Sequence, residues 1–406
     1  MRILIVSQYF PPETGAAATR WGEYANILSS YGHDVTILCE IPNYPTGIIA
    51  NGYSKFRTHT EESPQSGIKI IRVPVWANSR QTTLQRFGFF ISFMLSAMIK
   101  ALQLPSYDIV IVSSPPLFVG LVGSVIKVFK KSIVLLDIRD LWPESAEVLG
   151  ELNSKIMVNI GRLMEKTIYR MSDGFLFTVP GFKKYFRRKF PQELLKFNYQ
   201  LMNGISSEFI RKLESSPVMS DQDSFKVLYS GNIGLAQNLE TIIEAATILK
   251  DEDITFQIVG DGARKEYLVA MTKQRELTNV EFISSIPRDQ LIDYILSAAI
   301  CVVPLQKSDL FLNAIPSKLI EYMGAGKPVI VSIRGEVEDI VNRSGCGLIV
   351  EPENPEQIAS SIMIYYNNSE KRINDGSNGA AYVRKHFLKE SLISNVLQGI
   401  TVSFKR

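Results

Sequence analysis

The chain has 406 residues, which is more than one hydrophobic core usually supports, so two domains are expected. Hydrophobic residues make up 46% of the chain and charged residues 21%, and this composition excludes a disordered protein. The formal net charge of only +3 argues against a nucleic-acid-binding protein, so no nucleic-acid partner is expected.

In the first half, short runs rich in β-branched residues recur, and helical patterns such as 15–31 separate most of them. Nearly continuous apolar strands are typical of parallel sheets that are buried on both faces, so this half is predicted to be a doubly wound α/β domain. The most apolar segment, between Arg86 and Lys100, has 13 uncharged residues. A spanning helix needs ~20, so this segment is expected to be a buried or interfacial helix. The predicted strands are 2–6, 34–39, 68–73, 107–113, 132–138 and 174–179.

Residues 213–224 are polar and show no periodicity, so they are predicted to be a linker. After them the same alternation of strand and helix restarts and predicts a second doubly wound domain. The expected organisation is a first domain over 1–212, a second over 225–385, and a helix over 386–406 that returns to the first. Ligands of such sheets bind at the carboxyl ends of the strands, so the site is expected in a cleft between the domains. The predicted strands are 225–230, 254–259, 279–283, 299–303, 328–332 and 347–350.

Cysteine and histidine usage limits the chemistry that the chain can carry. Cys39, Cys301 and Cys346 are widely spaced and form no CxxC motif, and the three histidines lie far apart. This pattern argues against a disulfide framework, a zinc knuckle and a histidine-based metal site. A protein of the reducing cytoplasm is the interpretation that fits.

Two loops of the first domain are candidates for chemistry. In the first, Gly15 can adopt backbone angles closed to other residues, ahead of a helix whose free N–H groups suit an anion. The alternative is a tight turn with Thr14 as the helix cap, and Arg20 is expected in solvent or on an anion. In the second, Asp140 and Trp142 offer a carboxylate and an apolar face for a sugar. The alternative there is acids at a helix N-terminus, a core tryptophan, and an Arg139–Asp140 pair.

Glycines follow two strands of the second domain. Gly231 and Gly234 come after the first strand, and Gly260 and Gly262 come after the second, where they would let a ligand approach the backbone. Arg264 and Lys265 then occupy the first turn of a helix, where cations oppose the helix dipole, and a bound phosphate would explain them.

The segment 316–323 combines a cation and an acid on one helix. Pro316 suits the first helical position, and Lys318 and Glu321, three residues apart, share a face. A diphosphate would contact the Lys318 ammonium and the free N–H groups at the start of the helix. The Glu321 carboxylate would accept hydrogen bonds from two vicinal hydroxyls of a ribose. The alternative is a surface ion pair that contributes ~0.3 kcal/mol.

Several stretches together resemble bacterial glycosyltransferases of family 4, which have the GT-B fold, and in particular N-acetyl-L-fucosamine transferases of O-antigen and colanic-acid clusters. The resemblance implies a retaining transferase that uses a nucleotide-sugar donor, here expected to be UDP-linked, with no metal and no cofactor. It also implies a lipid-linked acceptor glycan on undecaprenyl diphosphate. The matching stretches are 1–38, DLWPES (140–145), LMNGIS (201–206), 229–246, VGDG (259–262) and PSKLIEYMGAGKPVIVS (316–332).

Carried over by motif, the resemblance implies that Glu321 holds the donor ribose and that Gly15 lets the diphosphate approach. Ser285 and Ile286 fall where the base is lined, and Asp140 falls near the reacting sugar. Asp140, Lys318 and Glu321 are the expected catalytic residues. The expected donor-binding residues are Gly15, Gly231, Asn232, Arg264, Ser285, Ile286, Asn313, Ser317, Lys318 and Glu321.

Three positions depart from the family pattern. Asn313 stands where many members have a second Glu, and Asn232 and Gln237 stand where many have an Arg and a Lys that hold the diphosphate. Lys318 and Arg264 are the nearest candidates to supply that positive charge.

The segment 182–197 carries six Lys or Arg and one Glu between aromatic residues. Basic aromatic helices sit at anionic membrane surfaces, so this segment predicts a peripheral protein at the inner face of the plasma membrane. The alternative is a solvated helix whose aromatic residues pack inward.

Two other functions remain open on the sequence. A nucleotide-sugar 2-epimerase shares the two-domain fold, although such enzymes rely on acidic and histidine side chains that are sparse here. A non-catalytic nucleotide-sugar-binding subunit would explain Asn232, Gln237 and Asn313.

Overall fold

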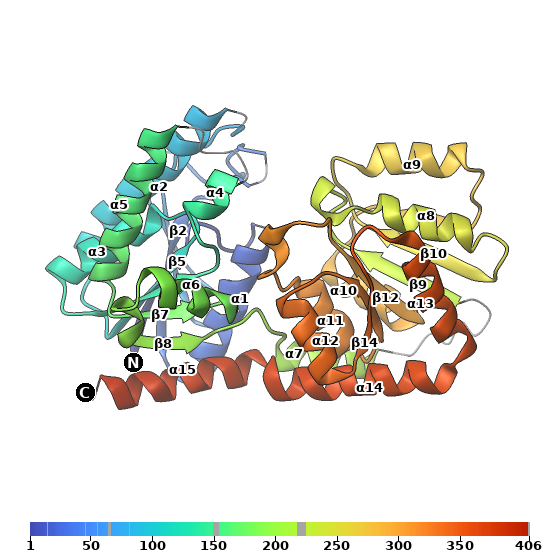
Figure 1. Cartoon of the computed structure of the whole chain (residues 1–406). Coiled ribbons are helices and arrows are strands. Elements are labelled where there is room, and N and C mark those ends of the chain that lie inside the picture. The colour runs from blue at the N-terminus through green and yellow to red at the C-terminus, as the bar shows by residue number, and fades with distance from the viewer. Residues whose placement is uncertain are drawn as a thin grey trace. The chain divides into compact units, whose positions relative to one another are not determined.

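The computed structural model describes residues 1–13, 15–44, 46–54, 56–63, 66–80, 82–148, 154–216 and 225–404. The chain divides into two compact units (Figure 1). Unit 1 comprises Met1–Met202 and Leu392–Arg406, and unit 2 comprises Asn203–Ser391.

Unit 1 is built on an eight-stranded sheet with the order β3-β4-β2-β1-β5-β6-β7-β8. β3 pairs antiparallel with β4, and the other described pairs are parallel. All six strands predicted for this half are confirmed to within two residues at each end. The strands are β1 (Arg2–Val6), β2 (Asp34–Glu40), β3 (His59–Glu62), β4 (Lys69–Val73), β5 (Ile109–Ser114), β6 (Ile133–Ile138), β7 (Gly174–Phe177) and β8 (Phe197–Gln200).

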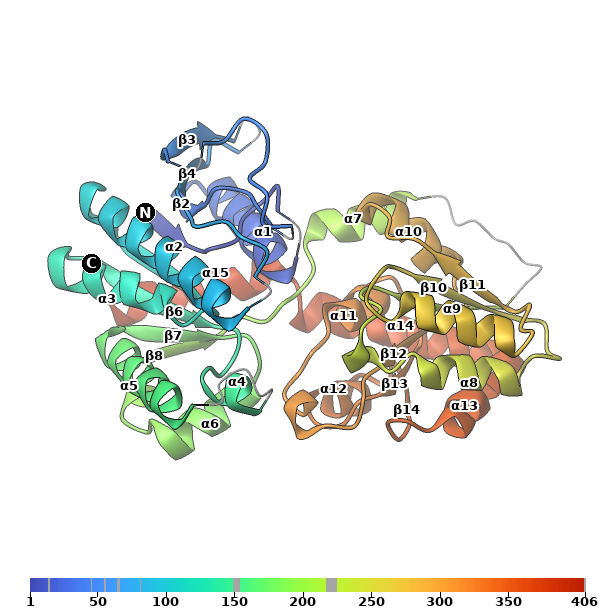
Figure 2. The same ribbon diagram turned by 90° about the horizontal axis from the view of Figure 1, so that it is seen from above.

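Helices cover both faces of this sheet (Figure 2). Strand residues such as Ile5 and Ile111 face a core shared with α1 (Ala16–Ser30) and α15 (Lys389–Ser403). Their neighbours point the other way, so a Cβ added at Gly123 of α3 would meet Val112 at 2.9 Å. The other helices of the unit are α2 (Thr83–Gln103), α3 (Val119–Phe129), α4 (Glu144–Val148), α5 (Lys155–Met171), α6 (Gly181–Lys189) and the 3-10 turn η1 (Glu193–Leu195).

Arg20 lies neither in solvent nor at an open anion site. Its side chain is buried, and Nη2 lies 2.7 Å from Oδ1 of Asp137, which ends the apolar run of β6 and is fully buried. The same carboxylate accepts from the indole of Trp21 at 3.1 Å and from the hydroxyl of Ser113 at 3.2 Å. Arg20 also donates to the carbonyl of Leu201 at 2.7 Å. The cation is therefore a structural link between α1 and the sheet.

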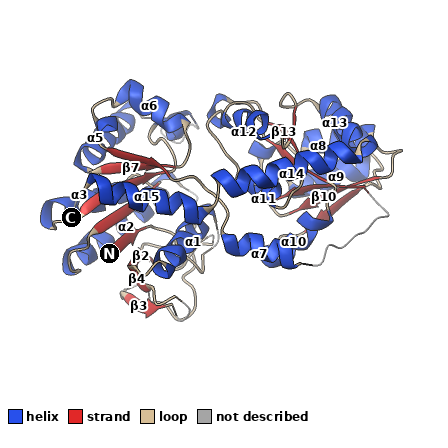
Figure 3. Cartoon of the chain, turned by 90° about the horizontal axis from the view of Figure 1, so that it is seen from below, coloured by secondary structure: helices blue, strands red, loops and turns tan. Residues whose placement is uncertain are grey.

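Unit 2 is built on a six-stranded parallel sheet with the order β11-β10-β9-β12-β13-β14 (Figure 3). All six predicted strands are again confirmed. The strands are β9 (Phe225–Ser230), β10 (Ile254–Val259), β11 (Val280–Ile283), β12 (Ile300–Pro304), β13 (Val329–Ser332) and β14 (Gly347–Ile349). The helices are α7 (Ser207–Ser215), η2 (Leu235–Gln237), α8 (Glu240–Ile248), α9 (Lys265–Gln274), α10 (Arg288–Ser297), η3 (Asp309–Phe311), α11 (Ser317–Gly324), α12 (Glu336–Ser344), α13 (Pro355–Asn367) and α14 (Ser369–His386).

The division between the units falls after Met202, earlier than the boundary expected after residue 212. α7 belongs to unit 2 because the ring of its Phe209 lies under the guanidinium of Arg288, 4.8 Å from the ring centroid. The return of the chain to unit 1 begins at Leu392, later than the expected residue 386. Of the predicted linker, residues 217–224 lie outside the described part of the chain.

Candidate active site

The order of the strands in unit 2 places a topological switch between β9 and β12. Successive strands run outward from β9 in one direction and from β12 in the other. Ligands of open α/β sheets bind at such a point, outside the carboxyl ends of the strands. The loop after β9 and the loop between β12 and α11 both begin there.

Two glycines bring the loops after β9 and β10 into contact. Gly231 has a φ of 126° and Gly260 a φ of 147°, conformations that side chains with a Cβ rarely adopt. A Cβ on Gly260 would lie 2.0 Å from the carbonyl oxygen of Gly231. The two strand ends therefore present bare backbone at this edge.

Lys318 brings its ammonium to the same place from the first turn of α11. Its Nζ lies 3.7 Å from the ring centroid of Tyr229, and 2.9 Å from where a Cβ on Gly231 would stand. Among the described residues it has no hydrogen-bond or ion-pair partner. Burial lowers the pKa of Lys318 to about 7, against a smaller opposing effect of the Glu321 carboxylate. The site thus holds a poorly solvated ammonium beside open backbone.

Glu321 lies one turn further along α11 and is paired with a residue that the sequence did not suggest. Its Oε1 accepts from Nη2 of Arg288 at 2.8 Å, and 17% of the Glu321 side chain is exposed. The ion pair expected as the alternative, with Lys318, is not the one observed. Arg288 opens α10, and its only sequence signal is a cation just after Pro287.

Tyr322 fixes α11 against the end of β9. Its hydroxyl accepts from the backbone N–H of Ser230 at 2.7 Å and lies 2.8 Å from the Ser230 hydroxyl. Pro316 is the N-cap of α11, one residue before the first helical position expected for it. Lys318 and Glu321 are thereby held at the switch point.

The two cations at the start of α9 are paired with carboxylates and are not available to a phosphate in this arrangement. Nε of Arg264 donates to Glu240 at 3.0 Å, and its guanidinium stacks on Tyr267, 3.9 Å from the ring centroid. Nζ of Lys265 donates to Asp261 at 2.6 Å. Acid partners on α8 and in the preceding loop therefore account for both cations.

The remaining predicted donor residues of unit 2 lie on the loops after β9, β11 and η3 and at the start of α11. The Asn232 side chain is exposed and donates to Gln237 at 3.3 Å, so the two positions where the family carries cations bond to each other. The Ser285 N–H donates to Asp261 at 2.7 Å, and Ile286 is half-buried. Asn313 and Ser317 are exposed, before and at the start of α11.

The two predicted site residues of unit 1 lie on different loops of that unit. Gly15 is the N-cap of α1, with a φ of 126° and open space where a Cβ would be, whereas Thr14 lies outside the described residues. Asp140 accepts from the N–H of Leu141 and the hydroxyl of Ser145, each at 2.8 Å.

The residues beside Asp140 have structural roles and do not form a sugar-binding surface with it. The Trp142 ring lies 6.0 Å from that of Phe118 and directly against Gly161 of α5, so it is a packing residue. Arg139 does not pair with Asp140; it donates to the Pro115 carbonyl at 2.8 Å.

The aromatic residues of 182–197 do not face outward as a membrane anchor would. Phe182, Tyr185 and Phe186 of α6 are buried, and the Phe186 ring packs 4.9 Å from that of Phe177 in β7. Arg187 and Arg188 are exposed. The alternative of a solvated helix with inward aromatic packing describes α6, because its apolar face completes the core beside β7.

The described residues offer neither a metal-binding cluster nor a membrane-spanning helix. No group of three or more His, Cys, Asp or Glu side chains in this part of the chain could hold a metal ion. No helix within the same residues is long and apolar enough to cross a bilayer.

Both halves of the chain match families of known proteins. Residues 15–194 match the glycosyl transferase 4-like domain, and residues 211–381 match glycosyl transferases group 1. The chain is 25% identical over 376 residues to WcaI of Escherichia coli (strain K12), covering 89% of this chain and 91% of that protein. The name of WcaI assigns it to colanic acid biosynthesis as a glycosyl transferase.

Solved structures share the fold at low sequence identity. Sucrose-phosphate synthase from Thermosynechococcus elongatus aligns with a TM-score of 0.73 and 19% identity, over 100% of this chain and 99% of that one. Anabaena HepE in complex with UDP-glucose aligns at 0.68 and 14%, over 99% and 100%. WaaG, a glycosyltransferase involved in lipopolysaccharide biosynthesis, aligns at 0.66 and 15%, over 98% and 99%.

Proposed function

Because the chain belongs to the glycosyltransferases of the GT-B fold, with a 4-like domain followed by a group 1 domain, we propose that unit 2 binds a nucleoside diphosphate sugar as the donor. The observation that carries this proposal is the ammonium of Lys318, which lacks a partner among the described residues and lies beside Gly231 at the switch point. A diphosphate there would supply the missing negative charge and would also meet the free N–H groups at the start of α11.

The proposed reaction is transfer with retention and without a metal. The bond from the anomeric carbon to the diphosphate breaks through an oxocarbenium-like state, and the negative charge grows on the departing phosphate. Lys318 and the backbone amides around Gly231 would stabilise that charge without reorganising. No protein nucleophile is proposed: the departing phosphate would take the proton from the acceptor hydroxyl on the same face of the sugar.

Two carboxylates have proposed roles in holding the donor. Glu321 would accept hydrogen bonds from the vicinal hydroxyls of the ribose, which would either replace Arg288 as donors to this carboxylate or join it. Asp140, whose two oxygens are held by Leu141 and Ser145, would lie near the transferred sugar.

The relatives support a finer proposal for the nucleotide and for the setting of the reaction. We propose UDP as the nucleotide, since HepE binds UDP-glucose, and N-acetyl-L-fucosamine as a candidate sugar. The proposed acceptor is a glycan on undecaprenyl diphosphate in O-antigen or exopolysaccharide synthesis, taken by unit 1 at the inner face of the plasma membrane. The names of WcaI and WaaG, which refer to colanic acid and lipopolysaccharide, support this setting.

One observation favours a second candidate, a binding subunit without activity. Asn232 and Gln237 bond to each other where the family carries diphosphate-holding cations. Release of UDP from a UDP-sugar, dependent on a lipid-linked acceptor, would exclude it, whereas binding without release would establish it.

The role of Glu321 is tested by comparing two alanine variants, one at Glu321 and one at its partner Arg288. We expect Glu321→Ala to weaken UDP binding about 10-fold or more, because a hydrogen bond to a charged group contributes ~1.5–3 kcal/mol. Arg288→Ala is the matched control and should change the Kd less than about 3-fold, because Arg288 contacts Glu321 and is not proposed to contact UDP. Calorimetric titration measures both. Equal losses in the two variants would reduce Glu321 to the partner of Arg288.

Binding of UDP is expected to take up a proton above neutral pH. The pKa of Lys318 is about 7 in the free protein, and a bound diphosphate would raise it. Between the two pKa values the complex holds more protons than the free protein, so affinity falls as pH rises above about 7. Titration at pH 8 in two buffers of different ionisation enthalpy measures the uptake; UDP itself is then fully ionised, since its phosphate has a pKa of about 6. Lys318→Met should abolish the uptake, and unchanged uptake would contradict the assignment.

A further inference from the structure

α2 is apolar on two opposite faces, and only one of them is covered. Four core-facing residues recur at intervals of four. A second stripe, offset by about half a turn, points outward and is exposed. A helix that is hydrophobic all round is normally buried on all sides. The buried stripe is Phe89, Phe93, Ala97 and Ala101; the exposed one is Leu84, Ile91, Leu95, Ile99 and Leu102, with Leu95 at 51% and Ile99 at 62%.

Trp76 fills the gap in the exposed stripe. Its indole lies across Gly88, where an added Cβ would be 2.2 Å from the ring, and 54% of Trp76 is exposed. Gly88 occupies the stripe position between Leu84 and Ile91. The apolar surface is therefore continuous along the helix, and the glycine is needed so that the indole can lie there.

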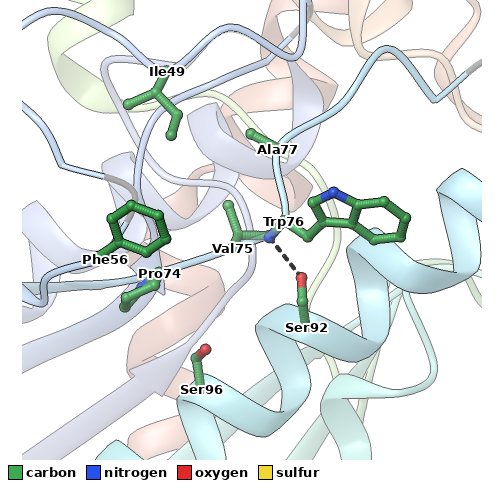
Figure 4. Close-up of a pocket in the computed structure, with 8 residues that line it drawn as sticks. All are labelled: Ile49, Phe56, Pro74, Val75, Trp76, Ala77, Ser92 and Ser96. Atoms are coloured by element: carbon green, nitrogen blue, oxygen red, sulfur yellow. Dashed lines mark hydrogen bonds between the residues drawn. The ribbon is translucent and has the colours of Figure 1, made fainter.

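An open pocket of about 440 Å³ adjoins this stripe (Figure 4). Phe56, which is 80% exposed, and Pro74 form one side, and Trp76 lies at the other. Ser92 and Ser96 of α2 form the floor, and the Ser92 hydroxyl accepts from the backbone N–H of Trp76 at 2.8 Å. Apolar side chains, among them those of Phe56 and Pro74, line the pocket together with the two serines.

α3 and α5 extend the same face with basic and apolar residues (Figure 2). In α5, exposed Ile156, Ile160 and Leu163 alternate with exposed cations. The single acid in the three helices, Glu165, is 3% exposed. Among these cations, Lys127 pairs with Asp173 and Arg162 with Glu147. The basic residues of the three helices and of the turn after α3 are Arg86, Lys100, Lys127, Lys130, Lys131, Lys155, Arg162, Lys166 and Arg170.

We propose that this outer face of α2, α3 and α5 docks on an anionic lipid membrane. Apolar side chains would enter the boundary between headgroups and acyl chains, and the lysines would extend to the lipid phosphates. The pocket beside Trp76 would receive one hydrocarbon chain. The proposal rests on the proposed function for its setting, since a lipid-linked acceptor would be met at such a surface.

An acidic protein would be the other possible occupant of a basic, apolar face. Protein interfaces gather apolar residues in a core that is depleted of charge and surround it with a polar rim. In the first half of α5, exposed cations and apolar residues instead lie next to one another, as with Lys155 beside Ile156 and Arg162 beside Leu163. Interleaving of this kind suits a surface of headgroups and acyl chains.

Co-sedimentation of the full chain with vesicles tests the proposal. The wild type should partition into phosphatidylglycerol vesicles at least 10-fold more strongly than into phosphatidylcholine vesicles. Ile91→Gln/Leu95→Gln/Ile99→Gln and Lys130→Glu/Lys155→Glu/Lys166→Glu should each lower that partition at least 10-fold. The matched control Lys250→Glu/Lys273→Glu/Lys385→Glu reverses three exposed lysines of unit 2 and should stay within twofold of the wild type.

Four outcomes would overturn the proposal. In the first, the wild type stays in the supernatant with both lipids, as a protein-binding face would give. In the second, the variants of this face bind vesicles like the wild type, and in the third the control variant loses as much vesicle binding as they do. In the fourth, only Arg187→Glu/Arg188→Glu on α6 lowers vesicle binding. UDP affinity is measured on every variant and should not change. A chain that binds vesicles but not UDP would contradict the proposed function and leave the docking face standing.

Discussion

Lys318→Met is expected to lower kcat/KM by about 10²–10³-fold, the loss that follows removal of one preorganised group that stabilises developing charge. Methionine keeps an unbranched side chain against Tyr229 while removing the ammonium. Because burial already opposes the charged form of Lys318 and lowers its pKa to about 7, the substitution should leave the thermal midpoint equal or higher. Loss of activity without loss of stability separates a donor-binding role from a structural one.

Lys327 offers the matched control for Lys318. It is also a half-buried lysine of unit 2 with a pKa lowered by burial, but its ammonium donates to the carbonyl of Leu296 at 2.6 Å. Lys327→Met should reduce the thermal midpoint and leave UDP affinity within about 3-fold, because a satisfied hydrogen bond is lost and no ligand contact is. Full turnover by Lys318→Met, in an assay that detects released UDP, would remove the lysine from the mechanism.

Asp137→Asn is expected to destabilise unit 1 by about 3–5 kcal/mol, because it removes one partner of a buried ion pair and leaves the Arg20 charge uncompensated. Arg139 adds to the effect, since its Nε lies 4.0 Å from the same carboxylate. Urea unfolding followed by tryptophan fluorescence measures it cleanly. The three tryptophans, Trp21, Trp76 and Trp142, all belong to unit 1, so the signal reports that unit.

Two further variants serve as controls for Asp137→Asn. Glu147→Gln breaks the exposed pair with Arg162, whose side chains are 44% and 51% exposed, and should cost under about 1 kcal/mol. Arg20→Met/Asp137→Leu replaces the buried pair with apolar groups and should recover much of the loss, since no unpaired charge remains. A loss under 1 kcal/mol for Asp137→Asn would show that water reaches Arg20.

The strands were predictable because of their apolar runs. A strand buried on both faces of a parallel sheet must be apolar along its whole length, so the ten interior strands of the two sheets are predictable, and the edge strands β11 and β14 are found because they also carry short apolar runs. β3 and β8 form the two edges of the first sheet, and their residues are half-buried or exposed. Because edge strands need no continuous apolar run, the sequence carried no signal for either.

The candidate site was predictable only where the topology of the sheet brings the ends of strands together. Lys318 and Gly231 meet because strand ends at a switch point must lie together. The local sequence suggests a phosphate at Arg264 because the partner Glu240 lies on another helix. The prediction for Arg20 is wrong for the same reason, although the sequence offers one signal: Asp137 is an acid near the end of an apolar run and requires a buried partner.

A crystal structure of the chain with bound UDP tests the central claim most directly. The account predicts the diphosphate within about 3 Å of the Lys318 Nζ, the hydrogen-bonding distance, and beside the Gly231 backbone, with the ribose hydroxyls on Glu321. UDP bound away from the start of α11, with Lys318 still lying only on Tyr229 and Glu321 only on Arg288, would contradict it.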